Sequence, residues 1–159
     1  MQKITLLCVG KLKERFYIQA VEEYAKRLQR YCRLEIIELA EQRLPESPSP
    51  AEIQQALLSE ARSIHEKLPR CPWIALCIEG QELSSTQLAD YIQHTALDGQ
   101  SQLCFLIGGS YGLHPSVKAA AQLRLSMSPM TFPHHLARVM LLEQIYRSYQ
   151  IIEGSKYHK

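Results

Sequence analysis

Three glycines lie close together late in the chain, directly after the apolar run LCFLI at residues 103–107. Gly108 and Gly109 follow the run, and Gly112 comes three residues later. Because glycine has no side chain, such a turn lets the backbone approach a ligand closely. A tight turn that needs a positive φ is the alternative explanation of the same glycines. This turn is the first candidate binding site.

The common nucleotide-binding, hydrolase and metal motifs are missing from the sequence. The first apolar run ends in VGKL at residues 9–12, with one glycine where the dinucleotide fingerprint GxGxxG has three. Neither GxxxxGK[ST] nor GxSxG occurs. His134 and His135 are adjacent and have no cysteine or carboxylate at ligand spacing, so no metal site is expected.

A second group of candidate residues lies near the C-terminal end. Glu143 and Arg147 are four positions apart on an expected helix. They form either part of a functional site or a surface ion pair that stabilises the helix by roughly a few tenths of a kcal/mol. Tyr157 and His158 carry rings with polar atoms, but a terminal segment ordinarily frays. The residues alone therefore favour a tail without a function.

Apolar runs and amphipathic stretches alternate along the chain, which predicts an α/β fold with a mostly parallel sheet and helices on both faces. Ligands of such sheets bind at the carboxyl ends of the strands, where Gly108 and Gly109 lie. Capping boxes at Ser49 and Ser84 mark two helix starts. Strands are expected at 4–9, 34–39, 73–78, 103–107 and 123–127, and helices at 14–31, 49–68, 84–98, from Pro115, and from Pro133 to about 152.

Length and composition are typical of one globular domain, expected to span residues 1–159, with 46% hydrophobic and 21% charged residues. No apolar run approaches the ~20 residues that cross a bilayer, and the first residues do not form a leader peptide. We therefore expect a cytoplasmic protein with no membrane partner. The five cysteines include no CxxC pair and are expected to be buried, reduced side chains.

Charge is unevenly distributed along the chain. The net charge is +5 over residues 1–33, −7 over residues 34–104 and +4 over residues 105–159. If the two ends meet in space, they form a basic surface that suits a polyanion such as nucleic acid. Scattered, solvated lysines are the alternative.

The last expected helix has a wide apolar stripe, which predicts a second partner surface, either the rest of the domain or another copy of the chain. The stripe consists of Leu136, Val139, Met140, Leu142, Ile145, Tyr146, Tyr149 and Ile152.

Several segments together resemble one family. These are ITLLCVGKLKE at the start, LIGGSYGL (106–113), LSMSPMTFPH (125–134), RVMLLEQIYRSYQI (138–151) and the ending YHK. In this order they are similar, over the whole chain, to the SPOUT-class ribosomal RNA large subunit methyltransferase H family. The resemblance implies an α/β domain with a C-terminal trefoil knot, a homodimer, and transfer of a methyl group from S-adenosylmethionine to N3 of a pseudouridine in ribosomal RNA.

The resemblance also implies roles for individual residues. Those matching donor-binding positions are Leu76, Gly108, Gly109, Met127, Ser128, Pro129, Met130, Thr131 and Phe132. Without the resemblance, Met127, Met130 and Phe132 would be assigned to the core. Arg147, Tyr157 and His158 match catalytic positions: Arg147 to hold a phosphate or the imide anion, and Tyr157 and His158 to stack on the base or accept its proton. Which of these two handles the proton stays open.

Two other functions are compatible with the sequence. One is a non-catalytic ribosome-binding module with a relic donor pocket. The other is a knotted transfer-RNA methyltransferase, although such enzymes usually carry additional RNA-binding domains. Free RNA, a ribosomal subunit and the whole ribosome are all candidate substrates, and the small size of the chain favours recognition shared with an assembled particle, such as the assembled ribosome.

Overall fold

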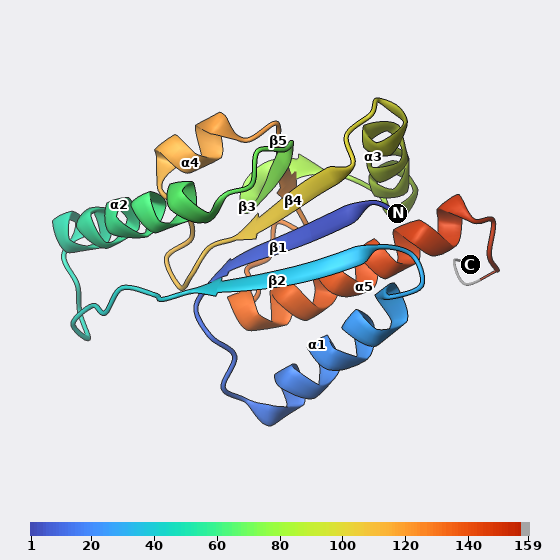
Figure 1. The fold of residues 1–159 in the computed structure, drawn as a ribbon. Coiled ribbons are helices and arrows are strands. Elements are labelled where there is room, and N and C mark those ends of the chain that lie inside the picture. The colour runs from blue at the N-terminus through green and yellow to red at the C-terminus, as the bar shows by residue number, and fades with distance from the viewer. Residues whose placement is uncertain (157–159) are drawn as a thin grey trace.

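The computed structural model describes residues 1–156, and the predictions for Tyr157 and His158 lie outside these residues. Strands and helices alternate strictly, as predicted (Figure 1). The elements in chain order are β1 (Lys3–Val9), α1 (Arg15–Leu28), β2 (Arg33–Leu39), α2 (Pro50–Lys67), β3 (Trp73–Glu82), α3 (Ser85–Leu97), β4 (Gln102–Ile107), α4 (Pro115–Ala120), β5 (Leu123–Ser126) and α5 (His134–Ile152).

The strands form one sheet in the order β2-β1-β4-β3-β5, and all neighbouring strands are parallel. The predicted α/β class is therefore confirmed, with a sheet that is parallel throughout. β3 is longer than the expected strand 73–78 and runs to Glu82. Its register against β5 shifts between Leu76 and Gln81. This irregularity lies next to the carboxyl end of β4, where the glycine turn begins.

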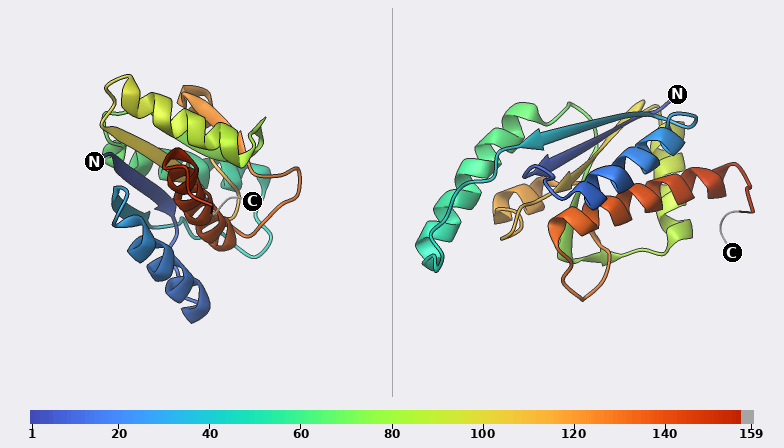
Figure 2. Two further views of the ribbon diagram at one scale, coloured as in Figure 1. Left: turned by 90° about the vertical axis from the view of Figure 1, so that its right-hand side faces the viewer. Right: turned by 90° about the horizontal axis from the view of Figure 1, so that it is seen from below.

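Helices cover both faces of the sheet, as the alternating pattern predicted (Figures 1 and 2). Alternate residues of β1 point to opposite faces: Ile4 and Leu6 belong to a core cluster with α1, α3 and α5. Leu7 and Val9 belong to a second cluster with α2 and α4. The side chains of all four are buried, as expected for a strand between two layers of helices.

Local signals set the starts of α2 and α3. The Ser49 hydroxyl accepts the Glu52 N–H at 3.2 Å, and the Glu52 carboxylate accepts the Ser49 N–H at 3.1 Å. Ser84 and Gln87 repeat this reciprocal pair. Both predicted capping boxes are confirmed. Each satisfies amide groups that the first helical turn leaves without a partner.

The helix α5 returns from the edge strand β5 and packs across the sheet between α1 and α3. Leu141, Leu142 and Ile145 are fully buried, and Tyr149 stacks on Tyr31 with ring centroids 6.1 Å apart. The width of the apolar stripe on α5 thus serves, in part, contacts with two helices as well as the sheet. No helix within residues 1–156 is long and apolar enough to cross a membrane.

The cysteine prediction is confirmed for Cys8 and Cys104, which are fully buried, while Cys77 is only half-buried. Burial raises the pKa of each of the two buried thiols to about 12. At neutral pH they are therefore protonated and unreactive.

Candidate functional site

A cavity of about 760 Å³ opens at the carboxyl end of β4, beside residues 76–79 of β3. Its walls are the glycine turn after β4 and the loop between β5 and α5. The volume falls in the range of ~300–1,000 Å³ that is usual for small-molecule sites. Eight of the nine predicted donor-binding residues line it: Leu76, Gly108, Gly109, Met127, Ser128, Met130, Thr131 and Phe132. Pro129 belongs to the same loop but is not among the lining residues.

The three glycines are needed for different reasons. Of the three, only Gly112 has a positive φ, of +79°. A Cβ on Gly108 would lie 2.5 Å from the carbonyl oxygen of Gly112. A Cβ on Gly109 would lie 2.6 Å from Oε1 of Glu41. The expectation of a turn with positive φ is thus right for Gly112 and wrong for Gly108 and Gly109, where close neighbours exclude a side chain.

The loop between β5 and α5 is shaped by its own serines. The Ser126 hydroxyl donates to the carbonyl oxygen of Ser128 at 3.1 Å, and the Ser128 hydroxyl accepts the Met130 N–H at 3.0 Å. Met130 is 72% exposed, so the core-packing alternative is wrong for this residue. Met127 does pack against the core cluster beneath the cavity. The loop therefore presents both backbone and apolar side chains to a ligand.

Arg138 fixes the first turn of α5 against the end of β1. The side chain of Arg138 is 2% exposed. Its Nη1 donates to Oε2 of Glu38 at 2.7 Å, and its Nη2 donates to the carbonyl oxygen of Gly10 at 3.1 Å. Partial burial opposes ionisation of Glu38, but the hydrogen bonds from Arg138 and the Leu12 N–H lower its pKa below the usual value. This buried pair holds the element that carries His134.

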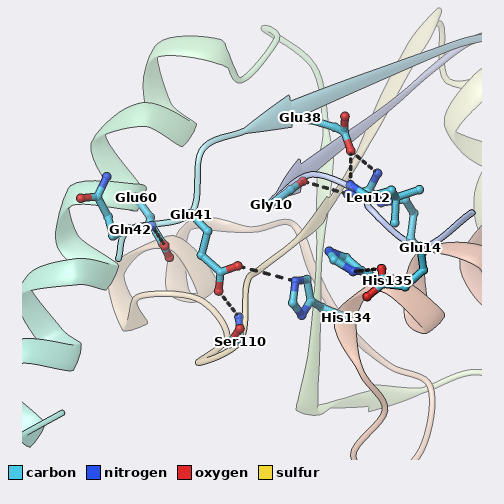
Figure 3. Close-up of polar contacts among 11 residues, drawn as sticks. Gly10, Leu12, Glu14, Glu38, Glu41, Gln42, Glu60, Ser110, His134 and His135 are labelled. Atoms are coloured by element: carbon cyan, nitrogen blue, oxygen red, sulfur yellow. Dashed lines mark hydrogen bonds and ion pairs between the residues drawn. The ribbon is translucent and has the colours of Figure 1, made fainter. Parts of the chain in front are cut away.

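His134 and His135 start α5, and each faces a carboxylate from a distant segment (Figure 3). His134 Nε2 lies 3.8 Å from Oε2 of Glu41, and His135 Nδ1 lies 3.6 Å from Oε2 of Glu14. His134 also lines the cavity. Sequence spacing missed both carboxylates, because neither is near the histidines in the chain. Among residues 1–156 no cluster of three or more His, Cys, Asp or Glu side chains is arranged to hold a metal ion.

Burial lowers the pKa of His134, and the neighbouring His135 and Arg138 lower it further. The carboxylates of Glu41 and Glu14 raise it, but they do not outweigh the other groups. His134 is therefore neutral at pH 7. A neutral ring next to the cavity does not repel a cationic ligand.

Acid is expected to destabilise the protein through His134. Because the folded-state pKa lies below the unfolded value of ~6.5, the unfolded chain binds the proton more readily. The contribution of His134 to stability is complete above this unfolded-state pKa, and it is lost as the pH falls from there through the lower folded-state pKa. We expect the thermal midpoint to drop less for His134→Gln than for wild type between pH 7 and 5.5. Parallel curves for the two proteins would contradict this.

Glu143 and Arg147 form the predicted pair on α5, with Arg147 Nη2 donating to Glu143 Oε1 at 2.6 Å. The side chain of Arg147 is 25% exposed and that of Glu143 is 18% exposed, so the pair is more buried than a surface ion pair. Glu143 lines a second cavity of about 580 Å³ between α3 and α5. Met127 lines both cavities, which are therefore adjacent.

Comparison with known proteins decides the family. The family described as "Predicted SPOUT methyltransferase" matches residues 2–158. The chain belongs to the SPOUT methyltransferase family. It is 46% identical to the ribosomal RNA large subunit methyltransferase H of Streptococcus equi subsp. zooepidemicus, over 99% of both chains. It is 45% identical to the protein of that name from Clostridium beijerinckii, over 98% of this chain and 99% of the relative.

Solved structures agree on the fold of this SPOUT methyltransferase. A probable methyltransferase from Bordetella pertussis is similar with a TM-score of 0.57 at 12% identity, over 93% of this chain and 96% of the other. A probable methylase family protein from Haemophilus influenzae gives a TM-score of 0.52 at 11% identity, over 99% of this chain and 70% of the other. The parallel sheet and the return of α5 are consistent with the knotted fold of the family. Membership of the SPOUT methyltransferase family, and not the fold alone, makes the chain an enzyme that uses S-adenosylmethionine as methyl donor.

Proposed function

We propose that this enzyme methylates N3 of a pseudouridine in large-subunit ribosomal RNA, on the assembled ribosome. The names of relatives at 45% and 46% identity over nearly the whole chain support the RNA substrate. The observation that carries the proposal is the cavity at the end of β4. It gathers eight of the nine predicted donor residues from three separate segments.

The residues present fit the proposed donor. When bound, S-adenosylmethionine supplies an electrophilic methyl group on a sulfonium. The loop after β5 offers backbone N–H and C=O groups for an adenine edge, and Met127, Met130 and Phe132 offer apolar walls that exclude water. His134, whose pKa is lowered, adds no positive charge to the cavity that would hold this cation. A metal is not required by this chemistry.

Activation of the acceptor is assigned to Arg147, Tyr157 and His158. An imide N3 is a poor nucleophile while it is protonated, so a positioned base or a stabilised anion accelerates transfer. Arg147 holds a phosphate or the imide anion, for which its guanidinium is suited. Its hydrogen bonds to Glu143 fix the direction of that guanidinium. Tyr157 and His158 stack on the base or accept its proton.

The test of this function is methyl transfer from labelled S-adenosylmethionine to naked large-subunit RNA, isolated large subunits, assembled ribosomes and transfer RNA. We expect assembled ribosomes to be the preferred substrate, with the label at N3 of a pseudouridine. Label on transfer RNA alone would favour the knotted transfer-RNA enzyme. Ribosome binding without affinity for S-adenosylmethionine would favour the non-catalytic module.

We also propose that the enzyme is a homodimer with α5 at or near the interface. On α5, Val139, Met140 and Tyr146 remain partly exposed after packing against the rest of the chain. The adjacent helix α1 carries Phe16, which is 63% exposed. Light scattering at micromolar concentration is expected to give twice the chain mass of 18.2 kDa. A monomeric mass, or a mapped interface that avoids α5, would contradict this prediction.

A further inference from the structure

Glu41 lies just after β2 and reaches across to the glycine turn at the donor cavity (Figure 3). Its Oε1 accepts the Ser110 N–H at 2.7 Å, across 69 positions of sequence. Its Oε2 lies on the other side, 3.8 Å from His134 Nε2. One carboxylate thus contacts two segments that line the donor cavity, although Glu41 itself does not line that cavity.

The contact depends on the absence of a side chain at Gly109. A Cβ there would meet Oε1, Cδ and Cγ of Glu41 within 2.6–3.2 Å. Gly109 is buried, and its neighbour Gly108 packs against the carbonyl of Gly112. The turn is therefore enclosed on one side by its own backbone and on the other by Glu41.

The segment that carries Glu41 is anchored in turn. The Gln42 N–H donates to Oε2 of Glu60 at 2.9 Å. Glu60 lies on α2 and is only 6% exposed. Burial raises its pKa, and the nearby Glu41 raises it further. The path from α2 through Glu60 and Gln42 gives Glu41 a fixed base from which to hold the turn.

We propose that Glu41 is a positioning residue that holds the glycine turn in the shape that receives the donor. The inference rests on the proposed function for the identity of the ligand, S-adenosylmethionine. Glu41 acts through the Ser110 N–H and through its contact over Gly109. A carboxylate that accepts a backbone N–H forms one of the stronger hydrogen bonds in proteins.

Two substitutions at Glu41 separate this role from a long-range effect of its charge on the cationic donor. Glu41→Gln keeps an oxygen that accepts the Ser110 N–H but removes the charge. Glu41→Ala removes both. Glu14 is the matched control. Its carboxylate lies 3.6 Å from His135, as that of Glu41 lies near His134, but the Ser110 N–H donates to Glu41 and not to Glu14. Glu14→Ala removes a comparable charge without releasing the turn.

Calorimetric titration with S-adenosylmethionine, together with thermal midpoints, measures the effect. We expect Glu41→Ala to raise the donor Kd by about tenfold, as for loss of a hydrogen bond to a charged group. Glu41→Gln is expected to stay within about threefold of wild type, and Glu14→Ala to match wild type. Exchange of the Ser110 amide hydrogen should be fast in Glu41→Ala and slow in Glu41→Gln.

A double-substitution cycle tests the contact from its other side. Gly109→Ala should weaken donor binding by displacing the Glu41 carboxylate. In the Glu41→Ala background it should add little, because the atoms it would strike are gone. Should Glu41→Ala not fold, exchange of the Ser110 amide hydrogen in Gly109→Ala still decides the matter, because Gly109 lines the cavity and the Kd of this variant alone does not separate the two contacts. Wild-type donor affinity in folded Glu41→Ala or Gly109→Ala would overturn the inference. Additive effects of the two substitutions on the Kd would also overturn it, and so would equal losses of affinity in Glu41→Gln and Glu41→Ala. A wild-type protein that fails to bind the donor would instead overturn the proposed function.

Discussion

Replacing Gly108 with valine is expected to abolish measurable binding of S-adenosylmethionine while the sheet survives. The reason lies in the turn itself. A Cβ at this position would stand 2.5 Å from the Gly112 carbonyl oxygen, which is backbone and cannot rotate away. The turn must open, and the wall of the cavity moves with it. A branched side chain enlarges the effect. Calorimetry should show a loss of affinity of at least ~100-fold, since several backbone contacts are displaced together.

Gly99→Ala provides the matched control for Gly108→Val. Gly99 has a φ of +84°, so a side chain there is strained, but no atom lies within 4 Å of its Cβ position. It follows α3, away from the residues that line the donor cavity. We expect a lower thermal midpoint with unchanged donor affinity. A folded Gly108→Val protein with wild-type affinity would remove the glycine turn from the proposed donor site.

Deleting Tyr157, His158 and Lys159 is expected to reduce methyl transfer by at least ~100-fold, the lower range for loss of an acid–base group. A lost stacking contact with the target base adds to this. The thermal midpoint and donor Kd should stay nearly unchanged, because chain ends seldom carry the core. Deleting Lys159 alone is the control, since it keeps both rings. Wild-type transfer by the truncated enzyme would show that the tail is dispensable.

The proton acceptor is identified by the pH profile of methyl transfer. If His158 accepts the proton, the rate of methyl transfer by wild type should increase with pH, with a rising limb centred near pH ~6.5, where an ordinary imidazole titrates. His158→Ala should lack that limb and lose less activity than the truncated enzyme, because Tyr157 still orients the base. Retention of the limb in His158→Ala would assign the proton to another group.

Most of the fold could be predicted from the sequence, because the signals that set its elements are local. Apolar runs mark the five strands, and the capping boxes at Ser49 and Ser84 fix two helix starts to the residue. The extension of β3 to Glu82 was missed, since EGQE lacks the apolar residues that mark a strand. The knotted path was implied by resemblance alone, because periodicity carries no information on how a chain threads.

The site was predicted less completely, and the missed residues share a cause. Arg138 lies among the apolar residues of the last helix. Its role in holding that helix is seen only in the structure, where it contacts Glu38 across 100 positions of sequence. Glu41 lies in a polar segment that reads as a loop, and its partner Ser110 is 69 positions away. No regular spacing of residues in the sequence predicts such contacts. The one available signal was the position of Arg138 among the apolar residues of the last helix, because a charged side chain that becomes buried usually has a partner.

The position of β1 between β2 and β4 has a consequence for how the chain acquires its structure. Lys3 pairs with Gln102, so the β1–β4 pair closes a loop of about 100 residues. During synthesis β1 can pair early with β2 only, and its other edge waits until β4 has emerged. The part of the sheet that α5 covers stays open until residues 134–152 have been made. Topologies dominated by distant pairings fold slowly, so pulse-labelled hydrogen exchange should show late protection at the β1–β4 seam.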